Sequence, residues 1–265
     1  MDLAFRDFGG NGTPILILHG LFGSAQNWTS IGRSLAAHGR CIALDLRNHG
    51  QSPHAPTHSL ADCVADLRDW AAKHTSGPVR LIGHSMGGLV AMGFAIANPD
   101  LTDTVAVIDI APRPYPLDHE QEFAALRTDI GRCATRADLD ALLAPVLPEQ
   151  ATRQFLLTNA VRTEGGKGFR WRLNVAALAS SSLSQDFQNV RGSFDGPALF
   201  VAGGRSGYLR GEDRPLVLRH FPRASFEVIP EADHWPQVSA PRELQSILKV
   251  FLACNKTVPL PSLKS

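Results

Sequence analysis

Ser85 stands between two glycines in the pentapeptide Gly-His-Ser-Met-Gly of residues 83–87. A short, mostly apolar run precedes it at 79–82, and apolar residues typical of a buried helix follow at 89–95. A serine in the pattern G-x-S-x-G at a strand-to-helix turn is typical of a nucleophile elbow. The turn is sharp enough to strain the serine backbone, and a side chain at either glycine would collide with the neighbouring chain. We therefore predict that Ser85 is a nucleophile held at the edge of a sheet.

A serine hydroxyl is a weak nucleophile until a base removes its proton, and histidine is the usual base. The chain has ten histidines, so position must decide between them. His234 follows the last predicted strand and precedes the last predicted helix, and the order serine, acid, histidine is that of hydrolases with this elbow. We predict His234 as the base; the alternative is a surface histidine in a turn. For His19, His49 and His84, which also lie near strand ends, we expect hydrogen bonds that hold loops.

The acid that should orient this histidine has two candidate positions. Many such enzymes carry it in a Gly-x-x-Asp motif after a late strand, but here Ser206 occupies that place. Asp213 comes later, where capping of a helix explains it. Asp109 directly follows an apolar run, and a charge at the end of a buried strand is costly without a partner. We predict that Asp109 orients His234, with Ser206 bridging the two. Asp213, or no carboxylate at all, are the alternatives.

Acyl transfer passes through a tetrahedral intermediate whose oxyanion needs backbone N–H donors. The elbow points the N–H of Met86 toward the same space as the serine hydroxyl. The second donor should come from the His-Gly-Leu-Phe-Gly loop at 19–23, whose glycines let the backbone approach closely. Leu21 is the first candidate for this donor and Phe22 is the second.

Composition and charge restrict what else the chain can do. Its 265 residues suffice for one α/β domain with an insertion, or for two small domains. The formal net charge is +1 without a basic stripe, so we expect neither nucleic acid nor a membrane as a partner. The four cysteines lack disulfide or metal spacing, and no secretory or membrane-spanning segment is seen. We predict a cytoplasmic protein without a metal site, either a monomer or a weak homodimer.

Strand and helix signals alternate from residue 15 to residue 108. The continuous apolar runs are of strand length, as in strands that are buried on both faces. This alternation predicts an α/β protein with a doubly wound, mostly parallel sheet and right-handed crossovers. Strands are expected at 15–18, 41–44, 79–82, 104–108, 197–202 and 225–229, and helices at 24–38, 60–74, 89–98 and 242–253.

The pattern changes after residue 111. Prolines at 112, 114 and 116 are incompatible with a continuous helix or a sheet ladder. The residues after them show helical segments without a convincing strand. We predict an inserted helical lid at 112–190, an α/β core at 1–111 and 191–254, and a flexible tail at 255–265. The lid helices are expected at 123–130, 139–146, 150–161 and 174–178.

Six segments carry a shared signature: His-Gly-Leu-Phe-Gly-Ser, Asp-Leu-Arg-Asn-His-Gly-Gln-Ser, Gly-His-Ser-Met-Gly-Gly, Asp-Ile-Ala-Pro, Gly-Gly-Arg-Ser and Asp-His-Trp. Together they resemble the α/β-hydrolase superfamily. More closely, the chain looks like the small bacterial carboxylesterases of the YbfF-like type, where a serine replaces the late aspartate and an aspartate follows the preceding strand. The resemblance implies the α/β-hydrolase fold with a lid. It also implies cofactor-free hydrolysis of short- to medium-chain carboxylic esters through an acyl-enzyme, with acyl thioesters as further candidates.

Other proteins share the elbow. Carbon–carbon bond hydrolases and a lyase of menaquinone synthesis usually keep the late aspartate, which this chain lacks. Cofactor-free perhydrolases (haloperoxidases) are a further alternative. A non-enzymatic hormone receptor on the same scaffold is another, although the intact pair of Ser85 and His234 favours an enzyme.

The lid is expected to determine which acyl chains enter. Its apolar side chains should mostly form the lid core, with one or two lining the pocket beside Phe22, Trp28 and Trp235. Such pockets are largely apolar with a few polar groups, so we predict a small ester substrate with an uncharged or weakly polar acyl group. The lid residues concerned are Phe123, Leu126, Leu142, Leu143, Phe155, Leu156, Phe169 and Trp171.

Overall fold

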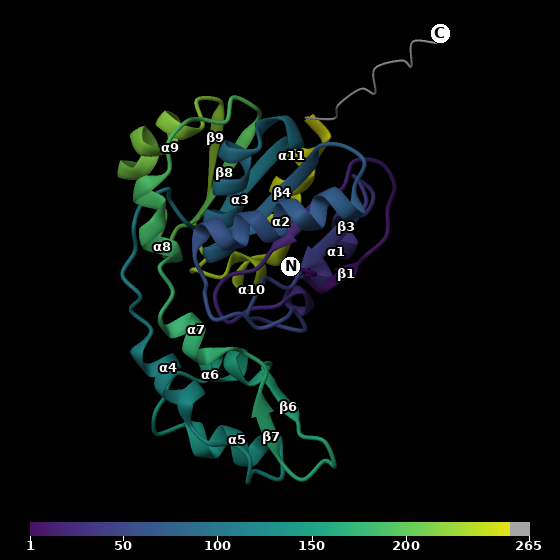
Figure 1. Ribbon diagram of the computed structural model, residues 1–265. Coiled ribbons are helices and arrows are strands. Elements are labelled where there is room, and N and C mark those ends of the chain that lie inside the picture. The colour runs from purple at the N-terminus through teal and green to yellow at the C-terminus, as the bar shows by residue number, and fades with distance from the viewer. Residues whose placement is uncertain (255–265) are drawn as a thin grey trace.

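Seven strands form one sheet in the order β1-β3-β2-β4-β5-β8-β9 (Figure 1). The computed structural model describes residues 1–254, so the predicted flexible tail at 255–265 lies outside the described residues. Within this sheet β1 pairs antiparallel with β3, and the other pairs are parallel. The predicted mostly parallel, doubly wound sheet is thereby confirmed. The strands are β1 (Phe5–Asp7), β2 (Ile15–Leu18), β3 (Cys41–Leu44), β4 (Val79–His84), β5 (Thr102–Ile108), β8 (Ala198–Gly203) and β9 (Ala224–Ile229).

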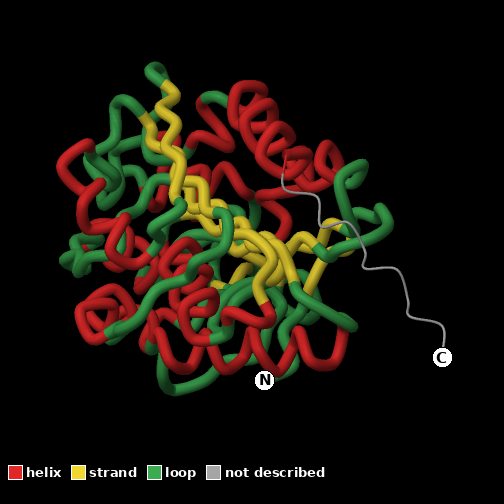
Figure 2. Tube along the Cα trace, turned by 90° about the horizontal axis from the view of Figure 1, so that it is seen from above, coloured by secondary structure: helices red, strands yellow, loops and turns green. Residues whose placement is uncertain are grey.

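Helices cover both faces of this twisted sheet, as the view from above shows (Figure 2). In β2, Ile15 and Ile17 pack into the core of one face, and Leu16 and Leu18 into the core of the other. Successive side chains of a strand point to opposite faces, which is why an uninterrupted apolar run suits a doubly covered strand. One face is covered by α1 (Thr29–Leu35) and α11 (Pro241–Cys254), and the other by α2 (Leu60–His74), α3 (Met86–Ala97) and α9 (Arg214–His220).

Two elements of the core differ from the prediction. The helix expected at 24–38 is a 3-10 turn (Ala25–Trp28) followed by the shorter α1. The edge strand β1 was not predicted, because its three residues are all exposed and carry no apolar alternation. Its ladder with β3 comes from tertiary pairing, which the local sequence pattern does not predict.

Between β5 and β8 the chain forms a separate layer at one end of the sheet, drawn at the bottom of Figure 1. It has its own apolar core, which includes Phe123, Leu143, Leu156 and Phe169, whereas Leu142, expected in that core, is 40% exposed. Its helices are α4 (Glu120–Arg127), α5 (Arg136–Leu143), α6 (Gln150–Leu157) and α7 (Val175–Ala179). The short α8 (Leu183–Asp186) falls within the predicted lid range, yet it packs on α2 and α3.

The prediction of a lid without strands is wrong. Strands β6 (Ala160–Arg162) and β7 (Phe169–Trp171) pair antiparallel as a hairpin. Each strand has three residues, too few to show a period of two, and α6 ends at Leu157 rather than at residue 161. Gly165 and Gly166 in the connecting loop have positive φ angles, which glycine adopts without steric cost.

Two further sequence predictions concern the setting of the protein. The four cysteines form no disulfide, as expected. No helix within residues 1–254 is long and apolar enough to cross a bilayer. The predicted cytoplasmic location stays a prediction.

Candidate active site

The turn between β4 and α3 has the geometry of a nucleophile elbow. Ser85 adopts φ 51° and ψ −123°, a backbone conformation that residues other than glycine rarely adopt. Its N–H donates to the carbonyl of Ile108 at 3.0 Å, which ties the turn to the neighbouring strand. A Cβ at Gly87 would lie 2.4 Å from the carbonyl oxygen of Leu18, and one at Gly83 would lie 2.3 Å from that of Gly87. Both flanking glycines are therefore required by close backbone contacts.

Three side chains from different loops meet at this turn. The Nε2 atom of His234 lies 3.0 Å from Oγ of Ser85, and its Nδ1 donates to Oδ2 of Asp109 at 2.7 Å. Asp109 has no exposed surface and a positive φ of 53°, and its Oδ1 accepts the N–H of Gly203 at 2.9 Å. With one nitrogen held by the carboxylate, the other is left to accept the serine proton. The structure thus brings together Ser85, His234 and Asp109, the three residues selected from the sequence.

Ser206 and Asp213 behave differently from each other. The hydroxyl of Ser206 donates to Oδ2 of Asp109, the same oxygen that accepts from His234. Within the described part of the chain, Ser206 makes no hydrogen bond to the imidazole, so the predicted bridge is wrong. Of the two partners predicted for it, Ser206 binds only the carboxylate of Asp109. The alternative acid Asp213 binds elsewhere, in an ion pair of 3.0 Å with Arg113.

Tyr208 stacks on the imidazole and was missed by the sequence analysis. Its ring centroid lies 3.9 Å from that of His234, with the planes 21° apart, and its other neighbour is the ring of Tyr115 at 5.5 Å. Burial, and then the nearby carboxylate of Glu122, raise the pKa of the Tyr208 phenol, so the ring stays neutral. A neutral aromatic face attracts an imidazolium. In the sequence, the one indication that Tyr208 lies near His234 is its position two residues after Ser206.

Two histidines near the site hold loops, as expected. His84 donates from Nε2 to the backbone carbonyl of His234 at 2.6 Å. Burial lowers the pKa of His84 to about 3, so the ring is neutral and keeps one N–H for this bond. His19 bonds Gly20 through Nδ1 at 2.9 Å and accepts the N–H of Leu46 at Nε2, at 3.0 Å. These bonds fix the loops that carry the base and the predicted oxyanion donor.

The loop after β2 presents its backbone to the serine. Phe22 has a positive φ of 62°, and its N–H donates to Nε2 of His49 at 3.3 Å, so this N–H is already used. The Phe22 carbonyl accepts from Nδ2 of Asn159, a buried lid residue, at 2.8 Å. Within residues 1–254 no hydrogen bond uses the N–H of Leu21 or of Met86. Leu21 therefore stays the first candidate for the second oxyanion donor, ahead of Phe22, and its role remains a prediction.

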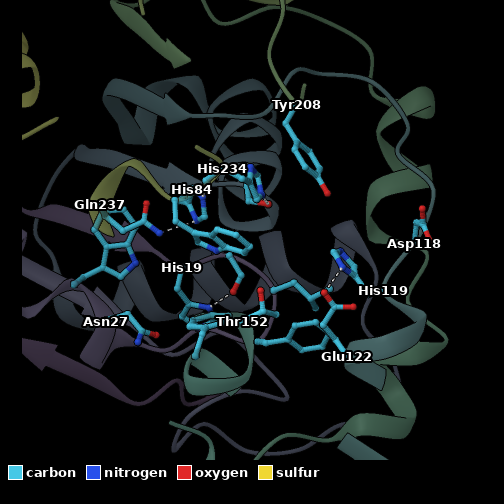
Figure 3. A pocket seen from close by; sticks show the side chains of 18 residues that line it. His19, Asn27, His84, Asp118, His119, Glu122, Thr152, Tyr208, His234 and Gln237 are labelled. Carbon is cyan, nitrogen blue, oxygen red and sulfur yellow. Dashed lines mark hydrogen bonds and ion pairs between the residues drawn. The ribbon is translucent and has the colours of Figure 1, made fainter. Parts of the chain in front are cut away.

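A cavity of about 250 Å³, called here the Ser85 cavity, opens over the serine and His234 (Figure 3). Phe22, Trp28 and Trp235 all line it, as predicted from the sequence. Phe155 is the one member of the predicted lid set that reaches it. Further lining side chains are polar and were not anticipated: Asn27, Asp118, His119, Glu122, Thr152, Tyr208 and Gln237.

A second hollow, called here the apolar cleft, meets the Ser85 cavity at the serine. Its volume is about 60 Å³, and Leu21, Ser85, His119 and Tyr208 line both spaces. The floor of the cleft is mostly aliphatic. Its other lining residues include Met86, Leu89, Ile110, Leu117 and Leu183.

Residues 15–245 match the model of the alpha/beta hydrolase family, so the chain belongs to that family. It is 35% identical over 269 residues to a protein of Danio rerio named sn-1-specific diacylglycerol lipase ABHD11, covering 95% of this chain and 83% of that one. Esterase YbfF of Escherichia coli (strain K12) is 33% identical over 249 residues, covering 91% and 94%. A solved structure named Marine microorganism esterase has a TM-score of 0.87 at 34% identity, covering 95% and 99%. The predicted kinship with YbfF-like esterases is confirmed, and these names agree with a carboxylesterase-type enzyme.

Replacing Asp109 with asparagine should lower kcat by about 10³- to 10⁴-fold, because an amide N–H donated to Nδ1 of His234 favours the wrong tautomer and the neutral amide no longer stabilises the imidazolium. Steady-state hydrolysis of a p-nitrophenyl ester, with circular dichroism to check the fold, measures this. Asp213→Asn is the matched control, since it breaks the ion pair with Arg113 and should cost thermal stability while kcat stays within about threefold. The reverse ranking of the two variants would assign the acid to Asp213.

Removing the lid amide in Asn159→Ala should lower kcat by about tenfold with little change in KM, because the backbone beside Leu21 loses its anchor. Asn174→Ala is the control, since Asn174 also ties the lid to a core loop, through Asn48 and Ala55, away from the serine. We expect it to lower the melting temperature by a similar amount and to keep kcat within about twofold. Equal losses of kcat in both variants would contradict a specific effect of Asn159.

Proposed function

We propose that this protein hydrolyses short- to medium-chain carboxylic esters through an acyl-enzyme intermediate. The observation that carries the proposal is the continuous series of hydrogen bonds from Ser85 Oγ through His234 to the buried Asp109, at 3.0 and 2.7 Å. The series ends at a cavity that is large enough for a small ester. Relatives named esterases support the same reaction class.

In the first half-reaction, Oγ of Ser85 attacks the ester carbonyl carbon as Nε2 of His234 takes the hydroxyl proton. The carboxylate of Asp109 stabilises the resulting imidazolium, and the N–H groups of Leu21 and Met86 bind the oxyanion. The carbon–oxygen bond to the alcohol then breaks, and the leaving alkoxide takes the proton from His234. In the second half, His234 removes a proton from water, which attacks the acyl carbon. The acid leaves, and the proton returns to Ser85.

The apolar cleft supports a short acyl chain. It begins at Ser85, where the acyl carbon must sit, and it is mostly aliphatic, with a volume of about 60 Å³. Pockets for larger ligands generally have several hundred cubic ångströms. Within the described part of the chain, no carboxylate, lysine or arginine lines the cleft, in keeping with the uncharged acyl group predicted from the sequence. Acyl thioesters with short chains would fit the same cleft.

Ser85→Ala should lower kcat for p-nitrophenyl butyrate by about 10⁵- to 10⁶-fold, because it removes the hydroxyl that lies 3.0 Å from Nε2 of His234 and would form the acyl-enzyme. In the wild type, kcat/KM should be highest for acetyl to hexanoyl esters and fall for dodecanoyl and longer chains. A diacylglycerol and an acyl-CoA belong in the panel, since one relative is named a diacylglycerol lipase.

Each alternative has its own outcome in this assay. Ligand binding without Ser85-dependent turnover would indicate a receptor, and turnover that requires hydrogen peroxide would indicate a perhydrolase. Release of products only from carbon–carbon bonded substrates would indicate the hydrolase or lyase alternative. Unchanged activity of Ser85→Ala would refute the proposed mechanism.

A further inference from the structure

The two hollows that meet at Ser85 are suited to opposite ends of an ester. His234 lines the Ser85 cavity and does not line the apolar cleft, whereas Met86 lines only the cleft. Because His234 must give its proton to the leaving alkoxide, the alcohol has to lie on the side of His234. The acyl chain then points the other way, into the cleft beside Met86. Residues that line the Ser85 cavity and not the cleft, among them Asp118 and Glu122, are therefore placed on the alcohol side.

The Ser85 cavity is charged negative on its lid side. Asp118 and Glu122 line it, and within the described part of the chain no lysine or arginine does. The imidazole of His119, whose Nδ1 lies 3.9 Å from Oε1 of Glu122, lowers the pKa of Glu122, so this carboxyl is ionised at neutral pH. Even a protonated His119 would leave one net negative charge. Figure 3 shows His119 and Glu122 joined on one side of the cavity, opposite His84 and His234, with Asp118 farther out on the same side.

Aromatic rings line the same space. Phe155 of the lid and Trp235 beside the base lie 6.3 Å apart between centroids, and Tyr208 lies over His234. Aromatic faces attract cations, best when carboxylates supply the opposite charge and water is partly excluded. A neutral alcohol would have no net Coulombic attraction to the two carboxylates, and an anionic one would be repelled. The five rings are Phe22, Trp28, Phe155, Tyr208 and Trp235.

We propose, building on the ester hydrolysis proposed above, that the preferred substrates are short-chain esters of a cationic alcohol, such as an amino alcohol or a quaternary ammonium alcohol. The ammonium group lies between the aromatic rings and the carboxylates of Asp118 and Glu122, while the acyl group occupies the apolar cleft. Asp118 and Glu122 act as specificity-determining residues that touch the alcohol and take no part in the proton transfers.

A pair of isosteric esters tests the charge directly. Acetylcholine and 3,3-dimethylbutyl acetate have the same shape, and only the first carries a positive charge. Wild-type kcat/KM should be about tenfold or more higher for acetylcholine. Glu122→Gln and Asp118→Asn should each lower this ratio, and the double variant should bring it close to one. Glu120→Gln is the matched control, because Glu120 is exposed on the same helix and does not line the cavity, so its ratio should equal that of the wild type.

A second readout uses the wild-type protein alone. Choline should inhibit hydrolysis of the neutral ester at a concentration about tenfold lower than 3,3-dimethylbutanol does. A wild-type ratio near one, or a ratio that stays high in the folded double variant, would overturn the inference while Ser85-dependent hydrolysis of both esters upheld the proposed function. Absence of Ser85-dependent hydrolysis of every ester would instead remove the proposed function, and this inference with it.

Discussion

The carboxylate of Asp109 is the constraint on which the rest of the site depends. It has no contact with solvent, and a buried charge without partners is strongly destabilising. Three donors stabilise it: the N–H of Gly203, the hydroxyl of Ser206 and the Nδ1–H of His234. These partners come from the ends of β8 and β9, so the same hydrogen bonds that stabilise the charge also set the position of the base. Loss of the charge would weaken these hydrogen bonds and leave the imidazole of His234 free to move.

The sheet order explains how these groups meet. Strands β4, β5, β8 and β9 are consecutive neighbours, and parallel strands bring their carboxyl ends to one edge. Ser85 follows β4, Asp109 follows β5, Ser206 follows β8 and His234 follows β9. The acid therefore sits one strand closer to the nucleophile than an acid after β8 would. A serine at that later position suffices, because its remaining task is to donate a hydrogen bond to Asp109.

The sequence predicted those parts of the fold and site that depend on local physics. Buried parallel strands need continuous apolar runs, the elbow needs its glycines, and a strand-end charge needs a partner, which together led to Ser85, Asp109 and His234. The hairpin β6–β7 was not predictable in this way, because three-residue strands are stabilised by each other rather than by their own pattern. Tyr208 was missed for a related reason. Its place over His234 is set by contacts with Tyr115 and Ser206, which only the folded loops bring together.

The lid contributes to the geometry of the site as well as covering it. Asn159 reaches from the lid to the carbonyl of Phe22, next to Leu21, the proposed oxyanion donor. Asp118 and Glu122 belong to the same lid segment and line the Ser85 cavity. The core carries Ser85, His234 and Asp109. The lid carries the carboxylates that line the Ser85 cavity and the Asn159 amide that binds the Phe22 carbonyl. Substrate choice in this protein can therefore change through the lid while the hydrogen bonds of Asp109 stay intact.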